Sequence, residues 1–308
     1  MKKFAAVFPG QGSQSVGMMS AYGDLPQIRA TFDEASEALG QDLWQMLADG
    51  PAELIGLTVN TQPLMLTAGV AVWRAWQALG GAQPAVVAGH SLGEYSALVA
   101  AGALQFSDAV KLVRYRAEVM QEAVPAGVGG MAAILNLDPE AVAAACAEAA
   151  QGEVVTAANL NSPVQIVIAG HKGAVERAMA GCLERGAKRA VPLPVSAPFH
   201  CALMQPAADK LRERLASITV SAPKIPVLNN VDVACLADPE AIRDALVRQA
   251  CSPVRWIETI RSMHSDGVEA VYEFGPGKVL AGLVKRIEGS LAIEALTDAA
   301  GIQALAAA

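Results

Sequence analysis

A serine turn flanked by glycines is the feature that most restricts how this 308-residue chain can fold. Ala85–Ala88 has the composition of a short buried strand, and residues 94–101 have that of a helix. Between them lies Gly89-His90-Ser91-Leu92-Gly93, the pattern G-x-S-x-G at a strand-to-helix junction. A strained turn of this kind lifts its serine above a parallel sheet. The motif therefore predicts an α/β fold in which Ser91 is a nucleophile.

The residue types around Ser91 favour this interpretation over a plain tight turn. Glycines two positions away on each side leave room for the neighbouring chain. The helix begins at once, so its first N–H groups point back towards the serine oxygen, where negative charge can gather. A bare G-x-S-x-G occurs often by chance, and it is the strand and helix around it that make the motif informative.

The first 125 residues alternate strand and helix, as expected for a parallel sheet covered on both faces. The pattern predicts a strand at Phe4–Phe8, and a glycine-rich loop follows it at Pro9–Gln14. This loop matches neither G-x-G-x-x-G nor the Walker pattern. Helices are expected at Leu25–Leu39 and from Pro63, which opens a helix rich in apolar residues.

A second unit follows Pro125 and has the order β-α-β-β-α-β, which is the ferredoxin-like motif. Its strands are expected at Val128–Leu135, Val154–Asn159, Gln165–Ala169 and Arg189–Val195, and its helices at Pro139–Ala150 and Lys172–Arg185. Sheet-and-helix alternation then resumes, with helices opening at Asp238-Pro239 and Ser252-Pro253. We therefore expect a large catalytic domain of residues 1–125 and 196–308, with a small ferredoxin-like subdomain inserted at 126–195. A cleft between the two is a natural ligand site.

The amino-acid composition restricts the classes of partner that the chain can bind and the cellular compartment in which it is expected. Hydrophobic residues make up 53% of the chain and charged residues 17%, which predicts a substantial core. The net charge of −7 and the absence of long Lys/Arg runs argue against nucleic-acid and anionic-membrane partners. The opening apolar run stops at Pro9-Gly10, too early for a signal peptide, and no apolar stretch has the length of a membrane span. Five scattered cysteines without C-x-x-C predict a reduced, cytoplasmic protein with no metal site.

Four histidines are available as a base for the serine: His90, His171, His200 and His264. His171 lies in a Gly-His-Lys-Gly turn and His264 near a helix end, so both are expected in solvent. His90 adjoins Ser91, but adjacent residues on such a turn usually point apart. His200 lies where the chain returns to the large domain and is the best candidate, although spacing alone allows a structural role equally well.

One cation lies on the apolar side of the helix expected at Ser107–Val124. At 100° per residue the apolar residues of this helix occupy one half-circle, and Arg116 falls near its middle, between Leu112 and Met120. A buried guanidinium cannot lose its charge and needs an anionic or carbonyl partner. Two interpretations remain open at this point. Arg116 forms a structural salt bridge to a core carboxylate, or it binds the carboxylate of a substrate.

Taken together, the motifs resemble those of the malonyl-CoA:acyl-carrier-protein transacylase family, the free-standing acyltransferases of bacterial fatty-acid synthesis. The resemblance covers essentially the whole chain, and several motifs in the family's order are far more specific than any one alone. They are Phe8–Gln14, Gly89–Tyr95, Tyr115-Arg116, Asn159–Pro163, His200–Met204 and Gly275–Leu280. The resemblance implies an α/β-hydrolase-like parallel-sheet core with a ferredoxin-like insert, in agreement with the pattern of elements.

The resemblance also implies a role for each catalytic residue. Ser91 corresponds to the family's nucleophile and His200 to its general base. The backbone N–H groups of Gln11 and Leu92 correspond to the oxyanion hole. Gln249 lies where the family uses a backbone carbonyl, in place of an aspartate, to orient the histidine. These residues would attack the thioester of malonyl-CoA and form a malonyl-serine intermediate, which implies ping-pong kinetics.

Three further residues are implied to bind substrate. Arg116 corresponds to the arginine that holds the malonyl carboxylate, and Asn161 belongs to a motif that lines the cleft. Phe199, just before the histidine, resembles the malonyl-selective pattern of related polyketide acyltransferases. The implied substrates are malonyl-CoA and the phosphopantetheine thiol of acyl carrier protein, with no metal or bound cofactor, and we expect a monomer.

Other functions share parts of this pattern. A serine esterase or lipase would share the serine and base but release the acid to water, and Arg116 and the lack of an obvious acidic third member argue against it. A sister acyltransferase of malonate decarboxylation or polyketide synthesis would keep the chemistry. A non-catalytic carrier-binding module would not need both Ser91 and His200. Because the carrier is expected to be acidic, docking needs a basic patch, and the candidates are Lys188-Arg189, Lys285-Arg286 and Lys210-Arg212-Arg214.

Overall fold

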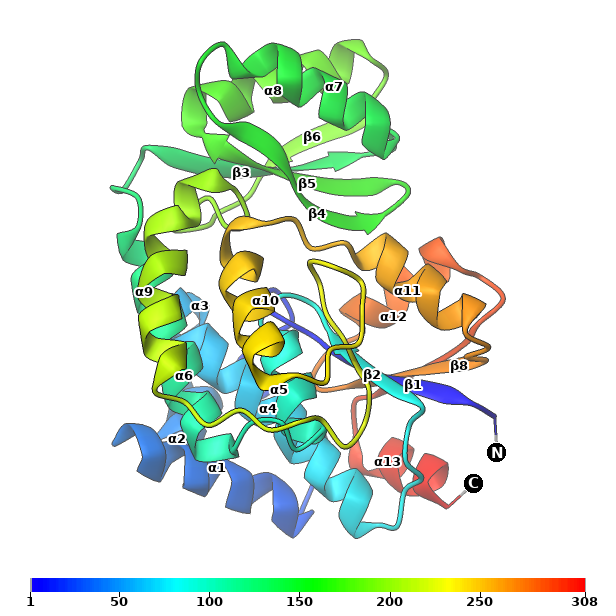
Figure 1. Ribbon diagram of the computed structural model, residues 1–308. Helices are drawn as coiled ribbons and strands as arrows, with labels where there is room; N and C mark the ends of the chain where they lie inside the picture. The colour runs from blue at the N-terminus through cyan, green and yellow to red at the C-terminus, as the bar shows by residue number, and fades with distance from the viewer. Residues whose placement is uncertain (1, 308) are drawn as a thin grey trace.

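A computed structural model describes residues 2–307, so residues 1 and 308, the outer ends of the expected large domain, lie outside the described residues. Two sheets organise the fold: a five-stranded sheet low in Figure 1 and a four-stranded sheet above it. Within residues 2–307, no helix has the length and apolar character needed to span a membrane.

The five-stranded sheet is parallel throughout and has the order β7-β2-β1-β8-β9. Its strands are β1 (Phe4–Phe8), β2 (Val86–Gly89), β7 (Val227–Leu228), β8 (Ala270–Phe274) and β9 (Ala292–Leu296). Every residue of the central strand β1 is buried, as expected for a parallel sheet covered on both faces. The expected strands at Phe4–Phe8 and before Ser91 are confirmed, and the two are parallel neighbours in this sheet.

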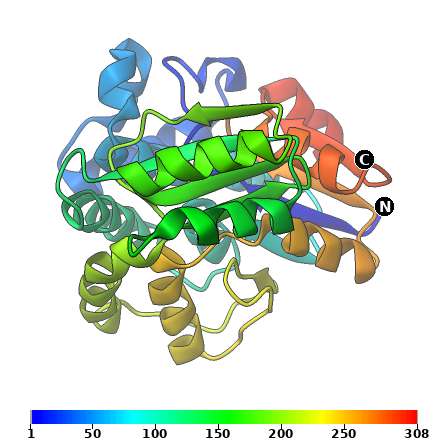
Figure 2. The same ribbon diagram turned by 90° about the horizontal axis from the view of Figure 1, so that it is seen from above.

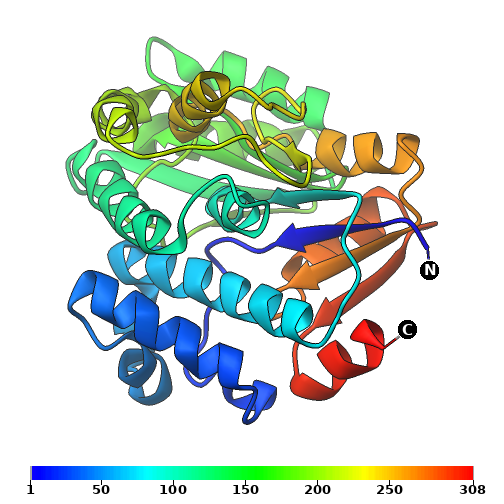
Figure 3. The same cartoon turned by 60° about the horizontal axis from the view of Figure 1, so that its bottom comes forward.

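Helices cover both faces of this sheet (Figure 3). The helices outside the upper sheet and its two covering helices are α1 (Pro26–Leu39), α2 (Leu43–Asp49), α3 (Ala52–Gly56), α4 (Thr58–Ala78), α5 (Gly93–Ala100), α6 (Phe106–Glu122), α9 (Gln205–Ala216), α10 (Pro239–Cys251), α11 (Trp256–Ser265), α12 (Val279–Ile287) and α13 (Ala299–Ala306). Because side chains alternate along a strand, Phe4, Ala6 and Phe8 enter one core with α4, while Ala5 and Val7 enter a second core with α11 and α12.

Two expected helix starts are wrong. Helix α4 begins at Thr58, with Pro63 inside it, rather than at Pro63. The side chains of Asn60 and Thr61 tie the first turn of α4 to α3 and to Leu57. The helix is buried along nearly its whole length, which offsets the hydrogen bond that Pro63 cannot donate. Helix α11 begins at Trp256 rather than after Ser252.

The delayed start of α11 has a specific cause in the packing of the two units. Val254 donates to the carbonyl of Ala158 and accepts from the amide of Leu160, both at 2.9 Å. These bonds hold Val254 extended against a strand of the upper sheet, so the chain cannot turn into a helix until it has passed this contact. The same two bonds join the upper sheet to the large domain close to the residue expected to orient His200.

The upper sheet is antiparallel, with the order β4-β5-β3-β6. Its elements are β3 (Gly129–Leu135), α7 (Pro139–Ala150), β4 (Val155–Ser162), β5 (Gln165–His171), α8 (Lys172–Glu184) and β6 (Arg189–Pro192). The expected β-α-β-β-α-β order is therefore present. Helices α7 and α8 cover the outer face, while strand β4 contacts α11 and α12 of the large domain (Figures 1 and 2). We propose residues 126–195, which enclose these elements, as the inserted subdomain.

Candidate active site

Ser91 lies on a strained turn between β2 and α5. Its φ is 50°, a conformation that residues other than glycine rarely adopt. The flanking glycines make this turn possible, because a Cβ at Gly89 would lie 1.8 Å from the carbonyl carbon of Gly93. A Cβ at Gly93 would lie 2.0 Å from the carbonyl oxygen of Phe8. Only glycine fits at either position, which gives the G-x-S-x-G spacing a steric origin.

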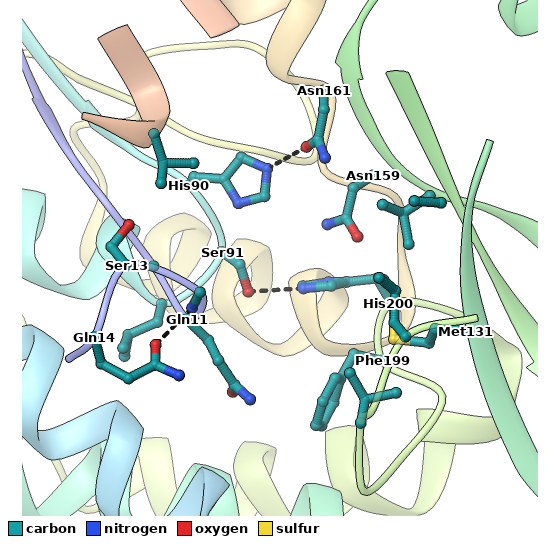
Figure 4. Close-up of a pocket in the computed structure, with 18 of the residues that line it drawn as sticks. Gln11, Ser13, Gln14, His90, Ser91, Met131, Asn159, Asn161, Phe199 and His200 are labelled. Carbon is teal, nitrogen blue, oxygen red and sulfur yellow. Dashed lines mark hydrogen bonds between the residues drawn. The ribbon is translucent and has the colours of Figure 1, made fainter. Parts of the chain in front are cut away.

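His200 lies against Ser91, although the two residues are far apart in the sequence. The Nε2 atom of His200 is 2.7 Å from Ser91 Oγ (Figure 4). Its Nδ1 is 2.9 Å from the backbone carbonyl of Gln249. Because a carbonyl only accepts, Nδ1 carries the proton, and the lone pair of Nε2 faces the serine hydroxyl. Burial, helped by the charge of Arg116, lowers the pKa of His200 to about 3. The imidazole is therefore neutral at pH 7.

The guanidinium of Arg116 contacts the same serine. Arg116 is 2% exposed and donates from Nη2 to Ser91 Oγ at 3.1 Å and to Gln249 Oε1 at 2.9 Å. Its Nη1 donates to Gln62 Oε1 at 2.8 Å, and its face lies over the ring of Tyr95. Its Nε is buried and has no acceptor in the described part of the chain.

Arg116 lies in the buried arc of α6, as its spacing indicated. The alternative of a structural salt bridge is wrong, because no carboxylate within residues 2–307 lies within 4.0 Å of this guanidinium. Its partners are two amide oxygens, a hydroxyl and a π face, which leave the positive charge without an ionic partner. Burial consequently lowers the pKa of Arg116, and the site favours a ligand that brings a negative charge.

Two backbone amides lie beside the serine, that of Gln11 in the loop after β1 and that of Leu92 on the serine turn itself. A Cβ at Gly10 would lie 2.5 Å from the carbonyl oxygen of His90, so glycine lets this loop approach the turn of Ser91. Gln11 and Leu92 both line the cleft around Ser91. Among the hydrogen bonds formed within residues 2–307, neither of their backbone N–H groups is a donor. Both amides are therefore open to an oxygen that develops negative charge.

The cleft has a volume of about 550 Å³ and lies between the two units. Asn161, on β4 of the upper sheet, accepts a hydrogen bond from His90, with 2.7 Å between Asn161 Oδ1 and His90 Nε2 (Figure 4). Burial lowers the pKa of His90, so its neutral ring donates to the amide oxygen. Phe199 lines the cleft beside His200. Within residues 2–307, His90 makes no hydrogen bond to Ser91, and its ring forms part of the cleft wall.

Three polar residues of this centre were not identified from the sequence: Gln62, Glu94 and Asn230. Gln62 could have been found as a polar residue within the long apolar run that became α4. Glu94 directly follows the G-x-S-x-G motif, where an acid in the first turn of a helix has an ordinary explanation. No sequence pattern marks Asn230. Between residues 2 and 307, no cluster of three or more His, Cys, Asp or Glu side chains is arranged to hold a metal ion, and the five cysteines are free thiols.

Comparison with known proteins gives a consistent result. Residues 6–294 match the family model described as the acyl transferase domain. The malonyl CoA-acyl carrier protein transacylase of Salmonella typhimurium is 59% identical over 305 residues, covering 99% of both chains. The crystal structure of an acyl-carrier-protein S-malonyltransferase from Burkholderia pseudomallei has a TM-score of 0.98 and 60% identity, covering 99% of this chain and 100% of that one. A malonyl-transacylase solved with a type II polyketide acyl-carrier protein has a TM-score of 0.97 and 52% identity, covering 99% of each chain.

Proposed function

The chain belongs to the acyl transferase family, and we propose that its site transfers malonyl from malonyl-CoA to the phosphopantetheine thiol of an acyl carrier protein through Ser91. The activity is that of an acyl-carrier-protein S-malonyltransferase of fatty-acid synthesis. One observation supports this proposal most directly. The buried guanidinium of Arg116 has no carboxylate partner within 4.0 Å among residues 2–307, and it donates to Ser91, which faces the neutral ring of His200.

The first half-reaction uses the hydrogen bonds that Ser91 already makes. Its hydroxyl donates to Nε2 of His200 and accepts from Arg116, so the proton moves to the imidazole as Oγ attacks the thioester carbon. The carbonyl of Gln249 holds Nδ1–H and stabilises the imidazolium that forms. The amides of Gln11 and Leu92 donate to the oxyanion, and each such donor contributes about 3 kcal/mol. The C–S bond then breaks, and the coenzyme A thiolate takes the proton from the imidazolium.

The second half-reaction repeats these steps with the carrier thiol. The thiol gives its proton to His200 and attacks the malonyl-serine ester. The oxyanion forms again beside the same amides. The C–O bond then breaks, and Ser91 recovers its proton from the imidazolium. Because one acyl-enzyme links two half-reactions, the kinetics are ping-pong. None of these steps requires a metal or a bound cofactor.

Arg116 accounts for the choice of a dicarboxylic substrate. The malonyl carboxylate lies one methylene from the reacting carbonyl, and the guanidinium lies directly beside the attacking oxygen. A carboxylate there gains charge-assisted hydrogen bonds and neutralises the buried cation. An acetyl group supplies no such charge, so it leaves the guanidinium without an ionic partner.

The carrier docks at the rim of the cleft, and the exposed pair Lys285-Arg286 is the basic patch best placed for it. Arg286 donates to Gln165, a residue that lines the cleft. By contrast, Lys210 and Arg212 are already engaged with the carboxylates of neighbouring helices. Lys285→Glu should therefore raise the KM for the carrier, most strongly at low salt, whereas Lys188→Glu should have little effect. Equal effects of the two substitutions would contradict this docking surface.

Malonyl-CoA and the acyl carrier protein are the substrates, and we propose that the chain acts as a monomer. The five free thiols are consistent with the reducing environment of the cytoplasm, where we propose that it works.

Intact mass spectrometry after mixing with malonyl-CoA tests the proposed function. The protein should gain one malonyl group, Ser91→Ala should gain none, and subsequent addition of carrier protein should remove it. Ser96→Ala is a matched control, because Ser96 is buried in α5 and does not line the cleft. Absence of the adduct from the wild-type protein, or its retention in Ser91→Ala, would contradict the proposal. Release of free malonate faster than transfer to the carrier would instead indicate an esterase.

A further inference from the structure

A buried carboxylate lies behind the serine turn and outside the reaction described above. Glu94 is in the first turn of α5 and is 2% exposed. It does not line the substrate cleft, and the separate cavity that it borders has a volume of only about 10 Å³. A cavity of this size has room for a single water molecule at most, so no substrate group can reach Glu94 there. Glu94 therefore acts on the reaction without contacting the substrate.

One oxygen of Glu94 accepts two hydrogen bonds, and both donors belong to residues that hold Ser91. Its Oε2 lies 2.9 Å from Nε2 of Gln249 and 2.9 Å from the backbone N of Asn230. Gln249 Nε2 also donates to the carbonyl of Ser91 at 3.0 Å. The side chain of Asn230 accepts from the amide of Ser91 at 2.8 Å and donates to the carbonyl of Gly89 at 2.7 Å. The strained turn of Ser91 is therefore held by Gln249 and Asn230, and both of these residues donate hydrogen bonds to Glu94.

The contact with Glu94 also decides which end of the Gln249 amide faces Arg116. The amide nitrogen of Gln249 is directed at two oxygens, those of Glu94 and Ser91, so its oxygen is directed at Arg116 Nη2. The reversed amide would place N–H groups against the guanidinium, donor against donor, and an oxygen against the Glu94 carboxylate. An acceptor at position 94 therefore fixes the amide in the orientation that Arg116 requires.

We propose that Glu94 is a positioning residue for malonyl transfer: its acceptor oxygen holds Gln249 and Asn230, and through them it orients Arg116 and the Ser91 turn. This inference rests on the proposed function of the site. The role is one of hydrogen-bond acceptance, since one oxygen makes both contacts. Burial raises the pKa of Glu94 to about 7, and a protonated carboxyl still keeps an acceptor oxygen for these two bonds.

Two substitutions separate this role from other uses of a buried acid. Glu94→Gln keeps an acceptor oxygen at the same distance along the side chain but has no charge, whereas Glu94→Leu has a similar volume and no acceptor. We expect Glu94→Leu to slow malonyl transfer onto Ser91 on the order of 100-fold, because displacements of about 1 Å have effects of this size. It should also reduce the preference for malonyl-CoA over acetyl-CoA. Glu94→Gln should retain most of the wild-type acylation rate and most of the preference for malonyl-CoA.

The experiment is a rapid-quench measurement of Ser91 acylation with malonyl-CoA and with acetyl-CoA, together with the melting temperature of each variant. Glu273→Leu is the matched control. Glu273 is also fully buried, and its two oxygens accept from the backbone amides of Leu280 and Ala281 at the start of α12. Its loss should lower the melting temperature without changing the ratio of malonyl to acetyl rates.

The possible results are distinguishable. If the wild-type protein takes up no malonyl group, the proposed function fails and not merely the role of Glu94. If the wild-type protein is acylated and a folded Glu94→Leu keeps its rate and ratio, the positioning role is wrong. Should Glu94→Leu not fold, Glu94→Asp withdraws the acceptor by one methylene but keeps the charge. Faster acylation in Glu94→Gln than in Glu94→Asp would support the proposal, and the reverse order would overturn it.

Discussion

Replacing Arg116 with alanine isolates the contribution of one guanidinium to substrate choice. The side chain touches the nucleophile at 3.1 Å and carries a charge with no carboxylate partner within 4.0 Å among residues 2–307. Arg116→Ala removes this charge and leaves Ser91 and its contact with His200 in place. We expect acylation by malonyl-CoA to fall sharply, while acylation by acetyl-CoA changes little or rises.

The magnitude follows from the bonds that a malonyl carboxylate can form. A guanidinium that holds a carboxylate with two arms makes two charge-assisted hydrogen bonds, each of about 1.5–3 kcal/mol. Their loss amounts to about 3–6 kcal/mol of transition-state stabilisation, or roughly 10²- to 10⁴-fold in kcat/KM for malonyl-CoA. Since acetyl-CoA makes neither bond, the ratio of the two kcat/KM values should fall by nearly the same factor.

The assay compares single-turnover acylation of Ser91 by the two thioesters. Arg114→Ala is the matched control, because Arg114 lies on the same helix but donates to Gln41 and does not line the cleft. It should retain the wild-type ratio, and the melting temperatures should show that both variants are folded. A folded Arg116→Ala that still selects malonyl strongly over acetyl would refute the reasoning, and the guanidinium would then be a structural feature of the site.

Three further predictions address the turn, the base and the core. Gly10→Ala puts a Cβ 2.5 Å from the carbonyl of His90, which should displace the adjacent oxyanion amide and lower kcat with little change in KM; an unchanged kcat would contradict this. Because the pKa of His200 is lowered to about 3, the acylation rate should stay level from about pH 8 to about pH 5, and a loss with an apparent pKa near 6.5 would contradict a neutral base. Burial raises the pKa of Glu273 from 4.5 to about 7, so the folded state holds this proton more tightly than the unfolded state. Stability relative to Glu273→Gln should therefore decrease as the pH rises from 4.5 to about 7, by about 3 kcal/mol, and urea titrations across this range should show the decrease; a flat difference would contradict it.

The sequence predicted those parts of the site that depend on local constraints. The turn around Ser91 is recognisable because steric exclusion at Gly89 and Gly93 leaves a readable spacing. The burial of Arg116 can be predicted because helical periodicity places it among apolar neighbours. The β-α-β-β-α-β order of the insert is likewise local, since each element follows the last within a few residues.

The parts that the sequence did not predict depend on long-range contacts. The start of α11 is delayed by pairing between Val254 and strand β4, whose partner residues lie almost a hundred positions earlier. The inward orientation of His90 depends on Asn161 across the cleft. The links of Glu94 to Gln249 and Asn230 likewise span far more than a hundred residues. No periodicity or spacing rule operates over such separations, so these features require the assembled fold.

The positions of Arg116 and His200 connect substrate choice with the strength of the base. The charge of Arg116 is one of the reasons why the pKa of His200 is low, so the cation that we propose binds the substrate also opposes formation of the imidazolium. A malonyl carboxylate on Arg116 neutralises that charge and removes this opposition at the moment when His200 must accept the proton from Ser91. Acetyl-CoA has no carboxylate, so the charge of Arg116 continues to oppose protonation of His200. The preference for malonyl-CoA therefore has two components, tighter binding of the carboxylate and a stronger base in its presence, and both depend on the same guanidinium.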